Sequence, residues 1–168
     1  VSEAMWTSRC HNLNAFATSQ PLYNLLQREI EQDHVPCCDA HGLGIIPWGP
    51  LAGGFLTGKY RRDQPYPPGS LLATRPMAYE RIATQDNWTK LEGLEAFARA
   101  RGHTVGELAI AWLLAQPRVC SVIAGASRAE QLDEHVAAAN WKLDATELAA
   151  IDRICAGDAS AEHRFTLR

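Results

Sequence analysis

The amino-acid sequence predicts an α/β protein with about three buried parallel strands and covering helices. Short, nearly continuous apolar runs, typical of strands that are covered on both faces, alternate with longer segments of helical periodicity. Parallel strands need long crossover connections, and the amphipathic segments between the apolar runs can provide them. These two observations favour an α/β architecture over an all-helical or all-β one.

Composition and charge are those of a globular protein. The 168 residues include 46% apolar and 21% charged residues, an ordinary balance for a folded domain. The net charge of −3 gives no reason to expect nucleic acid or an anionic membrane as a partner. No apolar run approaches the ~20 residues of a membrane span, and no signal peptide opens the sequence, so we expect a cytoplasmic protein.

The cysteines predict neither disulfide bonds nor a metal site. Their number is odd, two are adjacent, and no C-x-x-C pattern occurs. We interpret them as thiols in a reducing compartment. They are Cys10, Cys37, Cys38, Cys120 and Cys155.

The first half of the sequence contains two of the predicted strands. The predicted elements in order are a helix over 2–11, a strand over 15–20, a helix over 27–42 and a strand over 43–49. Gly42 is suited to end the second helix. A connection rich in Gly and Pro then runs to about Gln85, and connections of this length are usually functional or mobile.

The second half contains the third strand. The predicted elements are helices over 86–102 and 104–116, a strand over 119–125, and helices over 127–139 and 144–156. Asp86 is a candidate cap, and Thr104 with Glu107 forms a capping-box pattern. We expect residues 1–156 to form the folded unit and 157–168 to be a polar, frayed tail. Because a three-stranded sheet has two open edges, we also expect self-association.

The stretch "IIPWGPLAGGFLTGKY" (45–60) combines an aromatic ring, several glycines and a lysine directly after the second strand. Trp48 offers a flat face for stacking. Gly49, Gly53 and Gly54 let backbone N–H groups approach an anion, and Lys59 supplies a positive charge. The segment is therefore either an ordinary loop or a site for a flat, anionic ligand.

A second candidate site begins where the third strand ends at Gly125. A helix starts near Ser127, and helix N-termini attract anions. Ser127 adds a hydroxyl donor, and Arg128 adds a planar guanidinium suited to phosphate. The alternative interpretation is a capped surface helix with solvated charges.

From about Asn14 to Ile154 the sequence resembles the C-terminal half of an aldo-keto reductase. The matching stretches are "SQPLYNLLQREIE", "GLGIIPWGPLAGGFLTGKY", "GELAIAWLLAQPRVCSVIAGASRAEQLDEH" and "LDATELAAID". The likeness is to the bacterial oxidoreductase branch, which potassium-channel beta subunits also resemble. It implies the C-terminal part of a TIM-type (β/α)8 barrel that uses NADPH to reduce a small aldehyde or ketone.

The resemblance also implies a set of NADPH-binding residues. Trp48 would stack on the nicotinamide, Gln20 would bind its carboxamide, and Arg128 would read the 2′-phosphate. Gln131, Glu134 and His135 would reach the adenosine. The full set is Gln20, Trp48, Gly49, Pro50, Leu51, Gly53, Lys59, Gly125, Ser127, Arg128, Gln131, Glu134 and His135.

Three positions depart from the family pattern and predict somewhat weaker cofactor binding. Gly49 stands where many relatives have Ser, and Leu71 stands where relatives usually have Arg. His135 replaces the usual Asn. None of these changes points to a different cofactor.

No catalytic residue is assigned in this sequence. The family's Asp, Tyr, Lys and His tetrad lies on the first strands of the barrel, which would precede Val1. We therefore expect a fragment that is inactive alone, although the full-length parent would be an NADP-dependent oxidoreductase. The alternatives are an NADPH-binding redox-sensing module of the channel-subunit type and a non-functional gene fragment.

Overall fold

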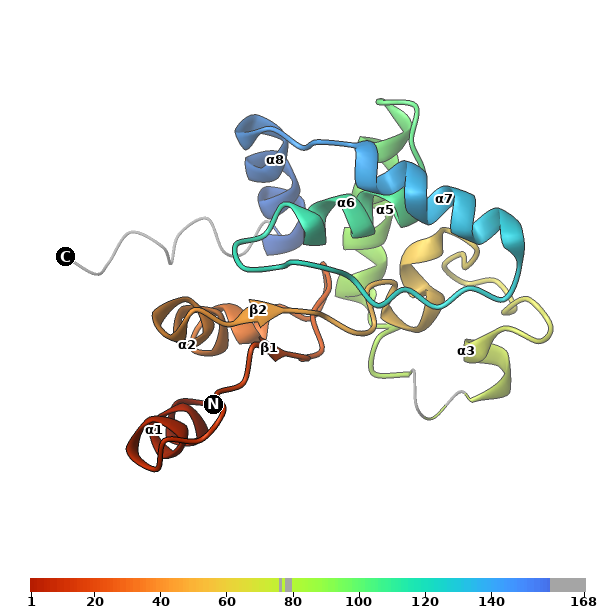
Figure 1. The fold of residues 1–168 in the computed structure, drawn as a ribbon. Helices are drawn as coiled ribbons and strands as arrows, with labels where there is room; N and C mark the ends of the chain where they lie inside the picture. The colour runs from red at the N-terminus through yellow and green to blue at the C-terminus, as the bar shows by residue number, and fades with distance from the viewer. Residues whose placement is uncertain (76, 78–79, 158–168) are drawn as a thin grey trace.

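The computed structural model describes residues 1–157 except 76, 78 and 79 (Figure 1). Helices account for most of its regular structure, and 3-10 helices carry the label η. The elements in order are α1 (Ser2–Cys10), β1 (Thr18–Ser19), η1 (Glu29–Glu31), α2 (His34–His41), β2 (Gly44–Ile45), η2 (Ala52–Thr57), α3 (Leu71–Thr74), α5 (Gln85–Arg99), α6 (Val105–Leu114), α7 (Ala129–Asn140) and α8 (Ala145–Ala156).

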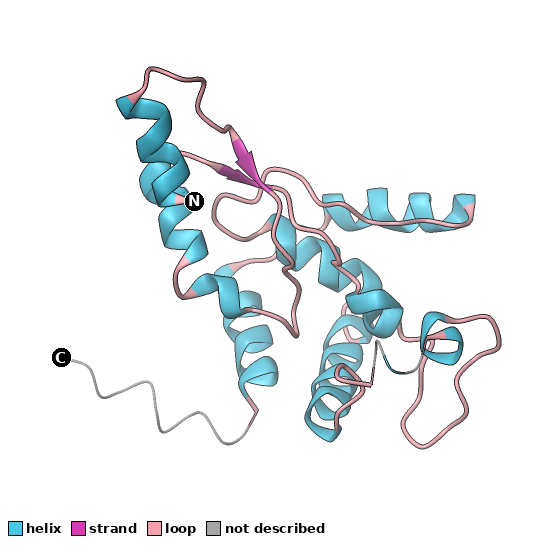
Figure 2. Ribbon diagram, turned by 90° about the horizontal axis from the view of Figure 1, so that it is seen from below, coloured by secondary structure: helices cyan, strands magenta, loops and turns pink. Residues whose placement is uncertain are grey.

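The right-handed crossover rule predicts that the three strand segments pair in parallel in their order along the sequence, and the structure shows this order. β1 pairs with β2, with Thr18 opposite Gly44 (Figure 2). Single parallel bridges join Ile45 to Val119 and Trp48 to Ile123, so residues 119–123 lie on the other side of β2. The predicted order and direction are therefore confirmed.

The strands themselves are much shorter than predicted. The expected ranges 15–20 and 43–49 shrink to two residues each, and 119–125 forms bridges without becoming a strand. The outer segments each have a hydrogen-bonding neighbour on one side within the described residues. Strands with few hydrogen-bonded neighbouring strands stay short, and the sequence pattern does not show how many neighbouring strands there are.

The main core lies between helices. Side chains from η2, α5, α6 and α8 form one apolar cluster that includes Phe55, Leu94, Trp112 and Ile151. α6 packs against both α5 and α7 (Figure 1). A smaller cluster beneath β2 consists of Met5, Cys38, Leu43 and Ile45. The α/β prediction holds, with most of the apolar burial supplied by the helices.

Local capping sets several helix starts. Thr104 Oγ1 accepts from the Glu107 N–H at 3.1 Å, and Glu107 accepts from the Thr104 N–H at 2.7 Å, which confirms the predicted capping box. The cap of α5 is Thr84 and not Asp86, because the Thr84 hydroxyl accepts from the Asn87 N–H at 3.2 Å. α7 begins at Ala129, two residues later than expected.

The prediction of a single helix over 27–42 was wrong. The structure has η1 and then α2, which runs from His34 to His41 and is followed by the capping residue Gly42, with a φ of 71°. Pro36 explains the break, since proline fits the first helical turn but cannot donate to a preceding turn. The predicted tail beyond Gly157 lies outside the described residues. Among the described helices, none has the length and apolar content needed to cross a membrane.

Candidate functional site

Two adjoining cavities lie at the carboxyl ends of the parallel segments. Their volumes are about 440 and 520 Å³. Both are lined by Leu51, Thr57, Lys59, Gly69, Ser70, Ser127 and Gln131. We call the two cavities together the cleft. It brings the loop after β2 next to the start of α7, two regions that are far apart in the sequence.

Most of the sequence-predicted binding residues line the cleft. They are Gly49, Pro50, Leu51, Gly53, Lys59, Gly125, Ser127, Arg128, Gln131, Glu134 and His135. Gln20 and Trp48 are absent from both linings. Trp48 is 48% exposed and pairs with Ile123, which does line the cleft. The ring therefore belongs to the segment after β2 that leads into the cleft, while Gln20 is an exposed residue after β1.

The glycine turn after β2 leaves room for a lysine. Gly53 and Gly54 have φ values of 65° and 91°, a region that disfavours residues with a side chain. A Cβ atom on Gly54 would lie 2.8 Å from Lys59 Nζ. The ammonium also lies 5.1 Å from the centre of the Tyr60 ring. The Gly54 N–H donates to Leu51 O at 2.8 Å, so this amide is already used within the turn.

The start of α7 is closed by its own glutamine. Gln131 Oε1 accepts from the Ser127 N–H at 2.7 Å, from the Arg128 N–H at 3.1 Å and from the Ser127 hydroxyl at 3.2 Å. Donors that the sequence suggested for an anion are thus engaged by Gln131. Among the described residues, neither the Arg128 guanidinium nor the Lys59 ammonium pairs with a carboxylate. Both cations therefore remain available to an anion.

A further part of the lining was missed by sequence reasoning. Pro67, Pro68, Gly69 and Ser70 line the cleft, as do Thr57, Thr104 and Gly106. The signal available in the sequence was the proline pair, which forms a stiff segment before α3. Thr104 appeared in the sequence only as a helix cap, and a residue's second neighbour in space is not visible from local spacing.

Comparison with known proteins decides the family. A model of the aldo/keto reductase family matches residues 1–156. The chain belongs to this family.

Relatives of this aldo/keto reductase chain include enzymes and channel subunits. It is 37% identical over 143 residues to a probable voltage-gated potassium channel subunit beta of Arabidopsis thaliana, covering 82% of this chain and 43% of that protein. It is 38% identical over 142 residues to the L-glyceraldehyde 3-phosphate reductase of Escherichia coli (strain K12), covering 80% of this chain and 40% of that protein.

A solved structure is also similar. The glycerol dehydrogenase of Gluconobacter oxydans matches with a TM-score of 0.72 and 30% identity, covering 87% of this chain and 44% of that one. The aldo/keto reductase chain thus spans less than half the length of these relatives. Of these relatives, one is named as a reductase and one as a dehydrogenase.

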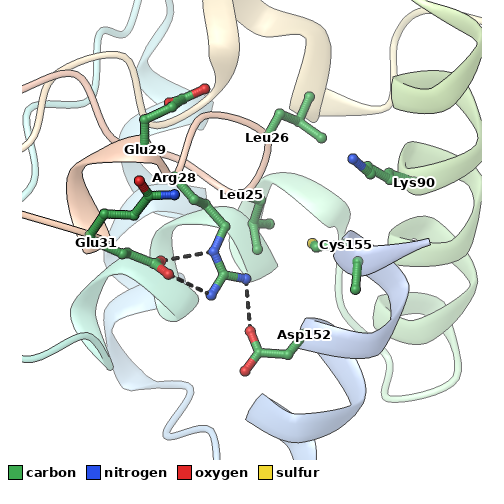
Figure 3. Close-up of a pocket in the computed structure, with 10 residues that line it drawn as sticks. Leu25, Leu26, Arg28, Glu29, Glu31, Lys90, Asp152 and Cys155 are labelled. Carbon is green, nitrogen blue, oxygen red and sulfur yellow. Dashed lines mark hydrogen bonds and ion pairs between the residues drawn. The ribbon is translucent and has the colours of Figure 1, made fainter. Parts of the chain in front are cut away.

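A separate hollow of about 360 Å³ lies between residues 25–32 and α8 (Figure 3). Arg28 is its central group. The guanidinium donates to both carboxylate oxygens of Glu31, at 2.8 and 3.1 Å, and to Asp152 Oδ1 at 2.7 Å. It also lies 4.8 Å from the centre of the Trp112 ring. Because its charge is matched by two carboxylates, this arrangement joins the loop to α8 and offers no unpaired cation to a ligand.

The electrostatics of this hollow follow from burial and pairing. Burial lowers the pKa of Arg28, but its hydrogen bonds to Glu31 and Asp152 outweigh that effect and raise it overall. Burial, and then the hydrogen bond to Glu31 at 2.7 Å, raise the pKa of Tyr23. Within the described ranges, no three His, Cys, Asp or Glu side chains gather as a metal site would require.

Proposed function

We propose that this chain is the NADPH-binding, C-terminal part of an aldo/keto reductase of the TIM-barrel type. The reaction would be reduction of a small aldehyde or ketone by hydride transfer. The observation that supports this most is the pair of cations in the cleft, Lys59 and Arg128, which have no carboxylate partner among the described residues. TIM barrels bind ligands at the carboxyl ends of their strands and often hold phosphates in the last loops.

The lining residues fit a dinucleotide. Lys59 gives a compact charge suited to the pyrophosphate, and Arg128 gives a planar fork suited to the 2′-phosphate. The exposed Trp48 ring would cover the nicotinamide, which supplies the hydride when it is bound. Gln131 would keep Oε1 on the Ser127 and Arg128 amides and point its Nε2 donors away from them. The role of Gln20 at the carboxamide stays a prediction.

Carbonyl reduction also needs a group that polarises and protonates the carbonyl oxygen. We assign no residue of this chain to that step. We therefore expect the 168-residue chain to bind NADPH without reducing carbonyls, and we propose that residues 1–156 act together with the first strands of a barrel. The catalytic tetrad would reside on those strands.

A second candidate function is an NADPH-binding redox sensor. The likeness to the Arabidopsis protein, named as a probable channel subunit, favours it. A sensor would hold its cofactor in a long-lived complex and transfer hydride slowly. Sequencing the genomic DNA upstream of the Val1 codon discriminates further, since in-frame strands with the Asp, Tyr, Lys and His tetrad favour the enzyme.

Calorimetric titration of the 168-residue chain with NADPH tests the proposal directly. We expect saturable binding of one molecule per chain, accompanied by quenching of tryptophan fluorescence because Trp48 lies beside the cleft. The substitution Glu130→Ala changes an exposed residue at the start of α7 that does not line the cleft, and it serves as the matched control. An absence of both heat and quenching in the folded chain would contradict the proposal.

A further inference from the structure

Ser70 is a buried residue of the cleft whose side-chain hydroxyl makes no hydrogen bond within the described part of the chain. It lines both cavities, as Lys59 and Ser127 do. The residue is only 8% exposed, and its hydroxyl oxygen is buried without a partner among the described residues. Among the described residues, the other buried side-chain nitrogen or oxygen without a hydrogen-bond partner is His41 Nδ1, and His41 does not line the cleft.

The usual role of a serine at this position is to cap the helix, and Ser70 does not perform it. Ser70 precedes α3, and a serine there normally accepts a hydrogen bond from one of the first helical N–H groups. The Ser70 side chain makes no such bond. The second amide of the helix, Leu72 N–H, lies 3.4 Å from Tyr60 Oη and donates to it. The Ser70 hydroxyl is therefore left over from the local structure.

The backbone around this hydroxyl is fixed. The Ser70 N–H donates to Pro67 O at 3.0 Å, and the Ser70 carbonyl accepts from the Thr74 N–H at 2.9 Å. The hydroxyl, now buried, would therefore reach a ligand in the cleft by rotation about the Cα–Cβ bond. A buried hydroxyl without a partner carries a desolvation penalty, which an oxygen atom of a ligand would remove.

We propose that the Ser70 hydroxyl donates a hydrogen bond to a pyrophosphate oxygen of the dinucleotide bound in the cleft. This inference rests on the proposed function, which identifies the occupant. The phosphate is the expected partner because Lys59 lines the same two cavities, and a hydroxyl that shares a cavity with a cation is suited to an anionic oxygen. A sugar hydroxyl could also accept from Ser70, but it carries no charge to pair with Lys59.

Two variants of Ser70 and one control test this inference. Ser70→Ala removes the hydroxyl, Ser70→Thr keeps it, and both are titrated with NADPH and with NADH by calorimetry. We expect Ser70→Ala to raise the Kd for both cofactors about tenfold, which corresponds to about 1.4 kcal/mol. The ratio of the two Kd values should not change, because both cofactors contain the pyrophosphate. Ser70→Thr should bind nearly as well as the wild type.

The control is Ser8→Ala. Ser8 is equally buried, at 6% exposure, and its hydroxyl donates to Asn14 O at 3.5 Å in a region outside the cleft. This variant should keep wild-type affinity. The thermal midpoint of the ligand-free Ser70→Ala chain should not fall, because the hydroxyl makes no hydrogen bond to any described residue.

The outcomes separate this inference from the proposed function. If the wild type binds NADPH and Ser70→Ala binds it equally well, the assignment of Ser70 is wrong and the proposed function stands. If the folded wild type binds neither cofactor, both are wrong. A Ser70→Ala variant that loses affinity only together with a large drop in its ligand-free thermal midpoint would show a structural role and would overturn the inference.

Discussion

Replacing Arg128 with alanine tests whether the start of α7 reads the 2′-phosphate that distinguishes NADPH from NADH. In the structure the backbone N–H of Arg128 and both donors of Ser127 are bonded to Gln131 Oε1. The Arg128 guanidinium lines the cleft and has no carboxylate partner among the described residues. The substitution therefore removes a free cation and leaves the helix start intact.

The expected magnitude follows from the exposure of this side chain. A hydrogen bond to a charged group contributes about 1.5–3 kcal/mol, which corresponds to roughly 10- to 150-fold in affinity. Arg128 is exposed, so water and salt screen its charge and place the effect at the lower end. We expect Arg128→Ala to raise the Kd for NADPH about tenfold and to leave the Kd for NADH nearly unchanged.

The assay is a calorimetric or fluorescence titration of each variant with both cofactors at two salt concentrations. Arg153→Ala removes another exposed cation, on α8, that does not line the cleft, and it should change neither affinity. The difference between the wild-type Kd values for NADPH and NADH should shrink at high salt, because salt screens the Arg128 charge. Equal losses for NADPH and NADH in Arg128→Ala would refute its role as the phosphate reader and leave α7 as an ordinary surface helix.

Three other outcomes are expected. Trp48→Ala should weaken NADPH and NADH alike in the same titrations, because stacking on nicotinamide does not involve the 2′ position; a loss for one cofactor alone would contradict this. Arg28→Met should lower the free energy of unfolding in urea by about 2 kcal/mol, since charged hydrogen bonds to Glu31 and Asp152 are lost; an unchanged urea midpoint would show that the link to α8 is not stabilising. Burial raises the pKa of the Cys155 thiol from 9.0 to about 11. The folded state therefore binds the thiol proton more tightly than the unfolded state does. The stability that this preference provides is fully present below about pH 9, and it is lost as the pH rises through 11. Urea unfolding from pH 8 to 11 should show this loss, and Cys155→Ala should reduce the slope.

Features set by neighbours in the sequence were predicted well. The capping box of Thr104 and Glu107 and the helix end at Gly42 appear in the structure as expected. Each depends on backbone groups within a few residues. The parallel order of the strand segments also followed from the sequence, because alternation with helices leaves few other connections. Errors arose where one local signal had to be weighed against another, as with Pro36 in the predicted helix over 27–42.

The candidate site was predictable in its residues and less so in its contacts. Motif resemblance identified most of the lining of the cleft, including both Lys59 and Arg128. It did not identify Ser70, whose burial depends on the packing of the proline segment against the rest of the cleft. It also assigned the Ser127 hydroxyl to an anion, whereas in the structure that hydroxyl donates to Gln131 at 3.2 Å.

The sequence by itself determined the family, the order of the elements and the residue types at the strand ends. These properties are encoded in short stretches, in which residues that are close in the sequence are also close in space. Only the tertiary structure decided how long the strands are, which donors of the cleft are already bonded and which charges are left unpaired. Those properties depend on contacts between distant segments, such as the pairing of Arg28 with Asp152, and each polar group can satisfy only the partners that the fold brings within reach.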